Sequence, residues 1–279
     1  MRFPVDVATV AKEISHHRFP DDPLVRIQGA DLPGLEGALC RAPVGKKGWG
    51  IIYNNRIESK GRVNFTLAHE FGHYLMHRLE YPDGIQCSAG DMLRWDSEYG
   101  LIESAANEFA ASLLMPLDDF RRQIDGSCQP SIEKLGECAV RYGVSLTAAA
   151  LRWLEYTSRR AVLVVSRDGF ILWARSSRKA LMSGRYFKTV DRPPQELPSL
   201  SLAGRPDLIR AGTTTINHEV GVWFPEACEE AAIVSDRFDF TISLLHLADA
   251  LSAKDWEHES AEEETLDTIF RDAAGQRSA

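Results

Sequence analysis

The chain has 279 residues, of which 44% are hydrophobic, and this is enough for one large domain or two smaller ones with separate cores. No apolar run approaches the roughly 18 to 20 residues of a membrane-spanning helix, and the first residues lack the basic-then-apolar order of a secretory signal. The five cysteines are odd in number and too sparse for a disulfide scaffold. We therefore expect a cytoplasmic protein with reduced thiols and no membrane partner.

The net charge of −8 is unevenly distributed along the chain. Residues 249–279 carry nine acidic and three basic residues, so the rest of the chain is nearly neutral. Residues 152–192 carry ten Lys or Arg and three Asp or Glu. A local positive excess of this size keeps nucleic-acid binding open for that stretch, although the overall charge disfavours it.

The first half of the chain predicts helices around one strand. Apolar residues follow helical spacing at 4–16, and residues 47–54 combine β-forming side chains with an Asn-Asn turn signal. A second helix is predicted at 65–79, a loop at 82–99, and a third helix at 103–116, which ends at a proline.

The second half begins with two short helices and then changes to a strand pattern. Residues 131–157 predict the helix pair, strands follow from about residue 160, and Arg-Asp-Gly at 167–169 predicts a hairpin turn. Later strand candidates are EVGVWF, EAAIVS and FTISLLHL. The fold class is therefore α+β. The predicted domains are residues 1–125, a helix-turn-helix-like connector at 126–159, a β-rich domain at 160–251 and an acidic tail at 252–279.

One helical segment carries a metal-binding motif, His69-Glu70-Phe71-Gly72-His73. At about 100° per residue, His69 and His73 lie about 40° apart on one helix face, so both imidazoles can meet one ion. Glu70 lies beside them, where it can accept a proton from water that a zinc ion has acidified. The alternative is a pair of surface histidines on an ordinary helix.

A catalytic zinc site usually has three protein ligands, so a third must come from elsewhere in the chain. Glu98, Glu103 and Glu108 are the nearest candidates. Glu103 lies on the apolar face of its helix, where a cation would compensate its buried charge, whereas Glu108 lies on the polar face. Glu103 is therefore the favoured ligand, with Asn107 one turn further as the side chain that braces it. The alternative for Glu103 is an acidic residue favoured at a helix N-terminus by the helix dipole.

Two further side chains near the motif allow more than one interpretation. His77 continues the four-residue spacing but lies about 80° from His69, which favours a core or surface role over metal binding. Cys87 falls between the two metal-binding helices and could occupy the open zinc position as a thiolate, which would exclude water and silence an enzyme. A buried structural cysteine is the alternative for Cys87.

The two helical segments extend to RVNFTLAHEFGH at 62–73 and ESAANEFAASLLMP at 103–116. In these segments the chain resembles the ImmA/IrrE family of bacterial metallopeptidases. The resemblance is close over 47–116 and looser over 131–157, which looks like the helix-turn-helix appendage of that family. The family's zinc and catalytic positions fall on His69, Glu70, His73 and Glu103.

The resemblance implies a zincin-like catalytic domain, mostly helical with a small edge sheet, that binds zinc (Zn2+), with Mn2+ as a substitute in vitro. It implies a helix-turn-helix transcriptional repressor as protein substrate, whose cleavage switches on a stress, mobile-element or antiphage operon. Because C-terminal domains of the family are often sensors, we expect a mixed α/β sensor domain here, with a GAF-like fold as one form. An extended substrate is expected to pair with the 47–54 edge strand.

Nucleic-acid binding depends on two segments. The second helix of 131–157 offers only Arg152 as a basic side chain, so packing is favoured over base recognition. Within 152–192, aromatic residues are interleaved with basic ones, a combination that holds single-stranded DNA without sequence preference, so such DNA is a candidate activator. The alternative is a set of core aromatics beneath a solvated basic face. The candidate nucleic-acid contacts are Arg175, Arg178, Lys179, Arg185 and Lys188.

Two functions from different classes fit these observations. The favoured one is a zinc endopeptidase that cleaves a repressor and is controlled by its C-terminal domain. The other is a catalytically silent zinc-binding module that regulates by holding a repressor or nucleic acid. A discrete cut that is lost when Gln replaces Glu70 would distinguish the two functions.

Overall fold

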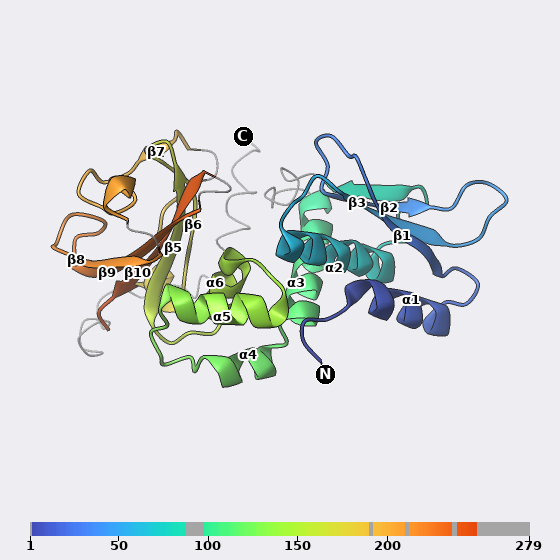
Figure 1. The fold of residues 1–279 in the computed structure, drawn as a ribbon, viewed down its shortest axis with the longest axis horizontal. Coiled ribbons are helices and arrows are strands. Elements are labelled where there is room, and N and C mark those ends of the chain that lie inside the picture. Colours follow the sequence, from blue (N-terminus) through green and yellow to red (C-terminus); the bar gives the residue numbers. More distant parts are fainter. Residues whose placement is uncertain (1, 88–97, 190–191, 210–211, 236–238, 250–279) are drawn as a thin grey trace, which may run out of the picture. The chain divides into compact units, whose positions relative to one another are not determined.

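The computed structural model describes residues 2–87, 98–189, 192–209, 212–235 and 239–249 (Figure 1). In these residues the chain forms seven α-helices and two β-sheets, so the predicted α+β class is confirmed. The chain divides into two compact units, which we call the N-terminal unit (Met1–Leu114 with Tyr142–Val144) and the C-terminal unit (Met115–Arg141 with Ser145–Leu251). The predicted acidic tail at 252–279 lies outside the described residues.

The N-terminal unit consists of helices and one four-stranded sheet. Two of its helices begin at side-chain caps: Asp6 accepts a hydrogen bond from the Thr9 N–H at 3.1 Å, and Ser59 accepts one from the Arg62 N–H at 3.3 Å. The helices predicted in this half of the chain are present, with shifted ends. Its elements in chain order are α1 (Val7–Arg18), β1 (Leu24–Ala30), β2 (Gly37–Arg41), β3 (Trp49–Asn54), α2 (Lys60–Met76), β4 (Gly84–Cys87) and α3 (Glu98–Leu114).

The four-stranded sheet has the order β1-β3-β2-β4, with β1 parallel to β3 and the other pairs antiparallel. Helices α1 and α2 pack on one face of it (Figure 1). The expectation that 47–54 forms an edge strand is wrong, because β3 pairs with β1 on one side and with β2 on the other. A substrate segment therefore cannot add to β3, and the outer strands of the described sheet are β1 and β4.

The core of the N-terminal unit lies between this sheet and its two covering helices. The polar atoms of its largest rings are satisfied, since the Trp49 indole donates to Asp22 Oδ2 at 2.8 Å and the Tyr74 hydroxyl donates to Asp22 O at 2.9 Å. Burial of a side chain such as Phe71 contributes about 1.5 to 3 kcal/mol, and this holds α2 against the sheet. The core contains Ala11, Leu24, Leu39, Trp49, Ile51, Phe71 and Tyr74.

The C-terminal unit contains helices and one six-stranded antiparallel sheet with the order β7-β6-β5-β10-β9-β8. The predicted helix pair at 131–157 is confirmed as α5 and α6, and Ser145 caps the second helix by accepting a hydrogen bond from the Ala148 N–H at 3.1 Å. The elements are α4 (Leu117–Gln123), α5 (Ile132–Tyr142), α6 (Leu146–Leu154), β5 (Arg160–Arg167), β6 (Phe170–Ser176), α7 (Arg178–Met182), β7 (Gln195–Glu196), β8 (Thr214–His218), β9 (Cys228–Ser235) and β10 (Phe240–Leu247).

Two predictions for the C-terminal unit, a hairpin and a strand, have different outcomes. The hairpin is confirmed, because Asp168 and Gly169 have positive φ angles of 51° and 81° and join β5 to β6. The strand predicted for EVGVWF is wrong. Gly221, at a φ of 94°, forms a turn there, and it directs Trp223 and Phe224 into the core instead of into a sheet.

The two faces of the six-stranded sheet are covered differently. Helix α6 packs against β5 and β6. The other face carries a buried cluster that includes Val162 and Val164 of β5 together with Trp223 and Phe224 from the turn before β9. Apolar side chains of the unit itself therefore fill this second face.

On the second face of the sheet, one buried carboxylate joins several segments of the chain. Glu230 on β9 is fully buried and accepts hydrogen bonds from side chains of three different segments: His218 Nε2 at 2.6 Å, Trp223 Nε1 at 2.9 Å and Ser243 Oγ at 2.7 Å. The backbone N–H groups of Leu202 and Ala203 donate to the same carboxylate at 2.9 and 3.1 Å. Because a buried charge is tolerated only when it is well hydrogen-bonded, this arrangement fixes the long connection between β7 and β9 onto the sheet.

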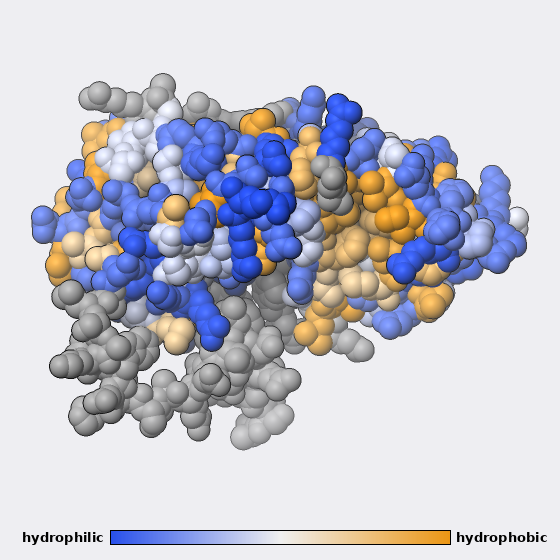
Figure 2. All heavy atoms as spheres, turned by 90° about the horizontal axis from the view of Figure 1, so that it is seen from below, coloured by the Kyte–Doolittle hydropathy of each residue, from blue (hydrophilic) through white to orange (hydrophobic). Residues whose placement is uncertain are grey.

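Figure 2 shows one face of the molecule, coloured by hydropathy. Among the described residues, no helix is long and apolar enough to cross a membrane. Figure 2 shows hydrophobic residues gathered on the visible face of the N-terminal unit, whereas hydrophilic residues cover much of the visible face of the C-terminal unit. Exposed large hydrophobic side chains of the N-terminal unit include Val25, Met76 and Leu79.

Candidate metal centre

The motif helix α2 and the helix α3 approach each other closely at Gly72. A Cβ at that position would lie 3.0 Å from Cδ1 of Phe109 and 3.3 Å from Cα of Ala106. Glycine therefore lets the backbones of the two helices come together without a side chain between them. This close packing sets Glu103, one turn before Ala106, opposite the two motif histidines.

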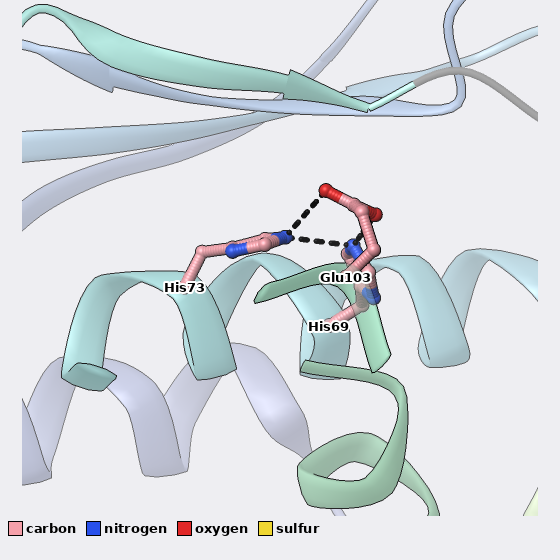
Figure 3. Close-up of side chains that lie close together, drawn as sticks. All are labelled: His69, His73 and Glu103. Carbon is pink, nitrogen blue, oxygen red and sulfur yellow. Dashed lines mark hydrogen bonds and ion pairs between the residues drawn. The ribbon is translucent and has the colours of Figure 1, made fainter. Parts of the chain in front are cut away.

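Three donor groups from α2 and α3 meet at one point (Figure 3). Nε2 of His69 and Nε2 of His73 lie 3.0 Å apart, and the Glu103 carboxylate lies 3.1 Å from each of them, through Oε2 and Oε1 respectively. All three side chains are buried, with relative exposures of 1%, 0% and 1%. Within the described residues, this is the one cluster of His, Cys, Asp or Glu with donor atoms close enough to hold a metal ion.

The protonation of this cluster fits a cation site. Burial lowers the pKa of His73 below its usual value, so the ring is neutral near pH 7. Burial also acts to raise the pKa of Glu103, but hydrogen bonds with His69 and His73 outweigh it and bring that pKa to about 2. An ionised carboxylate and neutral imidazoles are the forms that bind a metal, since each then presents a lone pair.

Each of the two metal-site histidines has a hydrogen-bond partner at Nδ1, the ring nitrogen that faces away from the metal centre. Nδ1 of His69 lies 3.0 Å from Oδ1 of Asn107, and because that oxygen only accepts, it can take the Nδ1 proton of a His69 ring that binds a cation through its Nε2 lone pair. Nδ1 of His73 lies 3.0 Å from Nδ1 of His77. Asn107 thus contacts His69, a partner that the sequence did not indicate, and His77 contacts His73. In the sequence, the four-residue spacing between His73 and His77 is the pattern that indicates this second contact.

The spacing of the donors fits a zinc-sized ion. Ligands held at about 2.0–2.1 Å around a tetrahedral zinc have donor atoms about 3.3 Å apart. The three observed separations of 3.0 to 3.1 Å are close to this value. Two imidazoles and one carboxylate also match the donor set that catalytic zinc sites use.

Glu70 is fully buried and lies against the first residue of β2. A Cβ at Gly37 would be 2.6 Å from Oε1 of Glu70 and 2.6 Å from Cγ2 of Thr66, so only glycine leaves room for the carboxyl group. The preceding residue, Glu36, pairs through its carboxylate with the Arg62 guanidinium in the first turn of α2. This ion pair fastens the start of β2 to α2 beside the Glu70 carboxyl group.

Cys87 is the last residue of β4, and its backbone pairs with Gly37 of β2. It therefore occupies the strand position next to the residue that lies against Glu70. The side chain of Cys87 is outside the described part of the structure, so its role as a zinc ligand stays a prediction. Free thiols in the described part are Cys40, Cys128, Cys138 and Cys228.

The basic candidates of the C-terminal unit divide into two groups. Arg178 and Lys179 on α7 and Lys188 beyond it are exposed, and Nζ of Lys188 lies 5.9 Å from the Tyr186 ring centroid. Arg185, in contrast, pairs with Glu226, which Arg160 also contacts at 2.7 Å. A structural partner thus already engages Arg185. Arg175 is exposed on β6.

Several aromatic side chains in the basic stretch belong to the core. Trp153 of α6 is fully buried, and Phe187 packs against Trp223 and Phe224 with ring centroids 5.8 and 5.1 Å apart. Tyr186 is 40% exposed and Phe170 is 39% exposed. Stacking of nucleic-acid bases could therefore use only part of the aromatic set.

The second helix of the connector is buried and does not present a recognition surface through Arg152. Arg152 is 6% exposed, and its Nε donates to the carbonyl of Met115 at 2.9 Å. Its Nη1 also pairs with Glu155 at 2.6 Å. The single basic residue of α6 is therefore engaged within the C-terminal unit, as expected for a packing role.

The donor set is the one that metallopeptidases use, in which a His-Glu-x-x-His helix faces a glutamate of a second helix. Residues 21–154 match the sequence model of a family described as Peptidase_M78, the IrrE N-terminal-like domain. Residues 21–154 therefore form a domain of the ImmA/IrrE type, and this type of domain implies a divalent metal and a protein substrate. The match ends with α6, before the strands β5 to β10. A comparison with curated proteins found no match.

Proposed function

We propose that the protein is a zinc-dependent endopeptidase in which His69, His73 and Glu103 hold the metal and Glu70 is the general base. The observation that carries this proposal is the meeting of three buried donor groups from two helices. A carboxylate buried beside two imidazoles is unfavourable unless a partner compensates its negative charge. A bound cation would do so. Glu70 lies on the same helix and one residue from His69.

The chemistry that a zinc ion supplies when bound is to acidify water and to polarise a carbonyl group. Glu70 would accept the proton of the attacking water and return it to the amine that leaves after the peptide bond breaks. Its carboxyl group is held for this task by α2 on one side and by the glycine of β2 on the other. Asn107 and His77 would keep the two histidine rings oriented while this occurs.

The substrate we propose is a helix-turn-helix transcriptional repressor in the cytoplasm, whose cleavage switches on a stress or antiphage-defence operon. The ImmA/IrrE-type domain supports a protein substrate. Because β3 is enclosed, we propose that an extended repressor segment pairs with β4, the outer strand next to β2. β2 is the strand that touches Glu70, so a segment on β4 would pass beside the site.

Two kinds of control remain proposals. Cys87, paired in register with Gly37, would act as a thiolate that blocks the open metal position. The C-terminal unit would respond to single-stranded DNA through its exposed cations, for which Arg178, Lys179 and Lys188 are better placed than Arg185.

The test is to incubate the full chain with zinc or manganese and the repressor encoded beside it, and then to look for one discrete cut. Glu70→Gln should keep the metal and lose at least about 100-fold in cleavage rate, because only the general base is removed. His73→Ala should lose both metal and cleavage. Metal content, measured by atomic absorption, separates the two effects.

Glu108→Gln is the matched control, since Glu108 is an exposed glutamate on α3 and should leave cleavage unchanged. A Glu70→Gln protein that cuts at the native rate would refute the catalytic assignment. Tight metal binding without any cut would favour the alternative, a silent zinc-binding module that holds a repressor or nucleic acid.

A further inference from the structure

His77 lies one helical turn after His73, at the C-terminal end of α2, and the two rings meet inside the protein. Nδ1 of His77 is 3.0 Å from Nδ1 of His73, and the ring centroids are 5.1 Å apart. His73 is fully buried and His77 is 8% exposed. A hydrogen bond between two buried ring nitrogens fixes the protonation pattern of both rings.

The direction of this hydrogen bond follows from the other side of His73. Nε2 of His73 faces Nε2 of His69 and the Glu103 carboxylate, and it can bind a cation only through a lone pair. A neutral imidazole with a lone pair at Nε2 carries its proton at Nδ1. His73 must therefore donate, and Nδ1 of His77 must accept.

The second motif histidine shows the same arrangement with a different partner. Nδ1 of His69 donates to Oδ1 of Asn107 over an equal distance of 3.0 Å. Each ring thus has an acceptor at its outer nitrogen and a lone pair at its inner one. A carbonyl oxygen or carboxylate commonly plays this part behind a metal-binding histidine, whereas here a third histidine plays it for His73.

The backbone around His77 makes it a firm support. Its N–H donates to the carbonyl of His73 at 2.8 Å, and its own carbonyl accepts from the N–H groups of Glu80 and Tyr81, each at 3.0 Å. The next residue, Arg78, is also buried, and its guanidinium lies 3.8 Å from the ring centroid of Phe19. The end of α2 is therefore held on both sides of the histidine.

We propose that His77 is a positioning residue of the metal centre, which accepts the Nδ1 proton of His73 and so holds the His73 ring with its Nε2 lone pair toward the ion. The inference rests on the proposed role of His73 as a metal ligand. It assigns His77 no contact with the metal or the substrate. It predicts that zinc affinity depends on the acceptor atom at position 77 more than on the imidazole ring that carries this atom.

Two substitutions separate the acceptor from the ring. His77→Asn places an amide oxygen, Oδ1, on the same carbon that carries Nδ1 in histidine, so it retains an acceptor as Asn107 does for His69. His77→Leu fills a similar volume but offers no acceptor. We expect His77→Leu to weaken zinc binding about 10- to 100-fold, and His77→Asn to stay within about threefold of the native protein. Competition with a coloured chelator measures both affinities.

A second measurement needs no substrate. In the zinc-loaded native protein, chemical shifts of isotope-labelled histidine nitrogens should show His73 protonated at Nδ1 and His77 unprotonated at Nδ1. His77→Asn should keep the hydrogen-bonded shift of the His73 Nδ1 proton, and His77→Leu should lose it. His17→Leu, at an exposed position of α1, is the control and should change neither the zinc affinity nor the Nδ1 proton signal of His73.

The proposal is overturned by a native zinc affinity in His77→Leu, by an equal loss in the Asn and Leu variants, or by a proton on Nδ1 of His77 in the zinc-loaded native protein. The tautomer measurement on the native protein decides the question even where a variant fails to fold. Absence of cleavage by the native protein would count against the proposed peptidase function alone, because neither readout for His77 depends on cleavage.

Discussion

At the scale of single residues, the site depends on two positions without a side chain. Gly72 lets α2 and α3 approach each other, and Gly37 leaves room between β2 and the Glu70 carboxyl group. Neither residue carries chemistry of its own. Each one fixes where a neighbouring functional group can lie, and displacement by about 1 Å can reduce a catalytic rate about 100-fold.

Replacement of Gly37 by alanine should reduce cleavage with little effect on metal binding. The new Cβ would lie 2.6 Å from Oε1 of Glu70, so the carboxyl group has to move, whereas the three donor atoms of the metal site are not among its nearest neighbours. We expect a loss of about 10- to 100-fold in kcat. Cleavage kinetics and zinc affinity are to be measured on the same preparation.

Gly50→Ala provides the control for the same sheet, since a Cβ there meets its nearest atom, the Arg26 carbonyl oxygen, at 3.5 Å, an ordinary contact. It should leave kcat and zinc affinity unchanged. Equal kcat values for Gly37→Ala and the native protein would show that the Glu70 carboxyl group does not depend on this gap.

The sequence predicts the local part of this site better than the tertiary part. His69, Glu70 and His73 follow from helical spacing, and Glu103 from the face on which it lies. The contact of Asn107 with His69 depends on how α2 and α3 cross, and the role of Gly37 depends on where β2 crosses α2. Patterns within one element do not contain this information.

At the scale of elements, β10 and α6 meet through a buried histidine. His246 of β10 is 5% exposed, and its ring centroid lies 5.7 Å from that of Trp153 in α6. Burial lowers the pKa of His246 to about 4, assisted by the charge of Arg159 and opposed by a hydrogen bond with the backbone of Pro130. The ring is therefore neutral in the folded protein at neutral pH.

This pKa predicts that the C-terminal unit loses stability in mild acid. In the unfolded chain the pKa is about 6.5, so between that pH and about 4 the unfolded state binds the proton more readily. The contribution of neutral His246 is complete above pH 6.5 and falls away toward pH 4, by at most about 3 kcal/mol. Denaturant unfolding of the full chain at several pH values measures it.

The comparison with His246→Phe isolates the effect of this one residue. Phenylalanine keeps the ring packing against Trp153 but cannot take up a proton, so the pH dependence of the variant should be shallower than that of the native protein over the same range. Parallel curves for the two proteins would place the acid sensitivity elsewhere in the chain.

Strand order is the element-scale property that the sequence did not provide. The segment 47–54 is recognisable as a strand from its residues, but its neighbours β1 and β2 come from segments with weaker patterns. One of these pairs is parallel and joins strands that are distant in sequence. The error about the edge strand therefore arises from pairing, not from the assignment of the strand itself.

At the scale of the whole molecule, the chain is organised as two compact units, and α4, α5 and α6 are grouped with the six-stranded sheet. The predicted connector at 126–159 was based on helical spacing and a turn, which show that the helices exist but not what they pack against. Its predicted limits therefore stay a prediction. Trp153, which packs against His246 of β10, is one residue that joins α6 to the sheet.

The burial of α6 has a practical consequence for where the chain can be divided. A recombinant fragment that stops at residue 154, where the family match ends, would strip α6 of the strands that shield it and present Ala149, Ala150 and Trp153 to solvent. Such a fragment should aggregate, whereas the full chain should stay monodisperse at the same concentration, and light scattering would compare them. A monodisperse fragment would show that the apolar side chains of α6 can be buried without the six-stranded sheet.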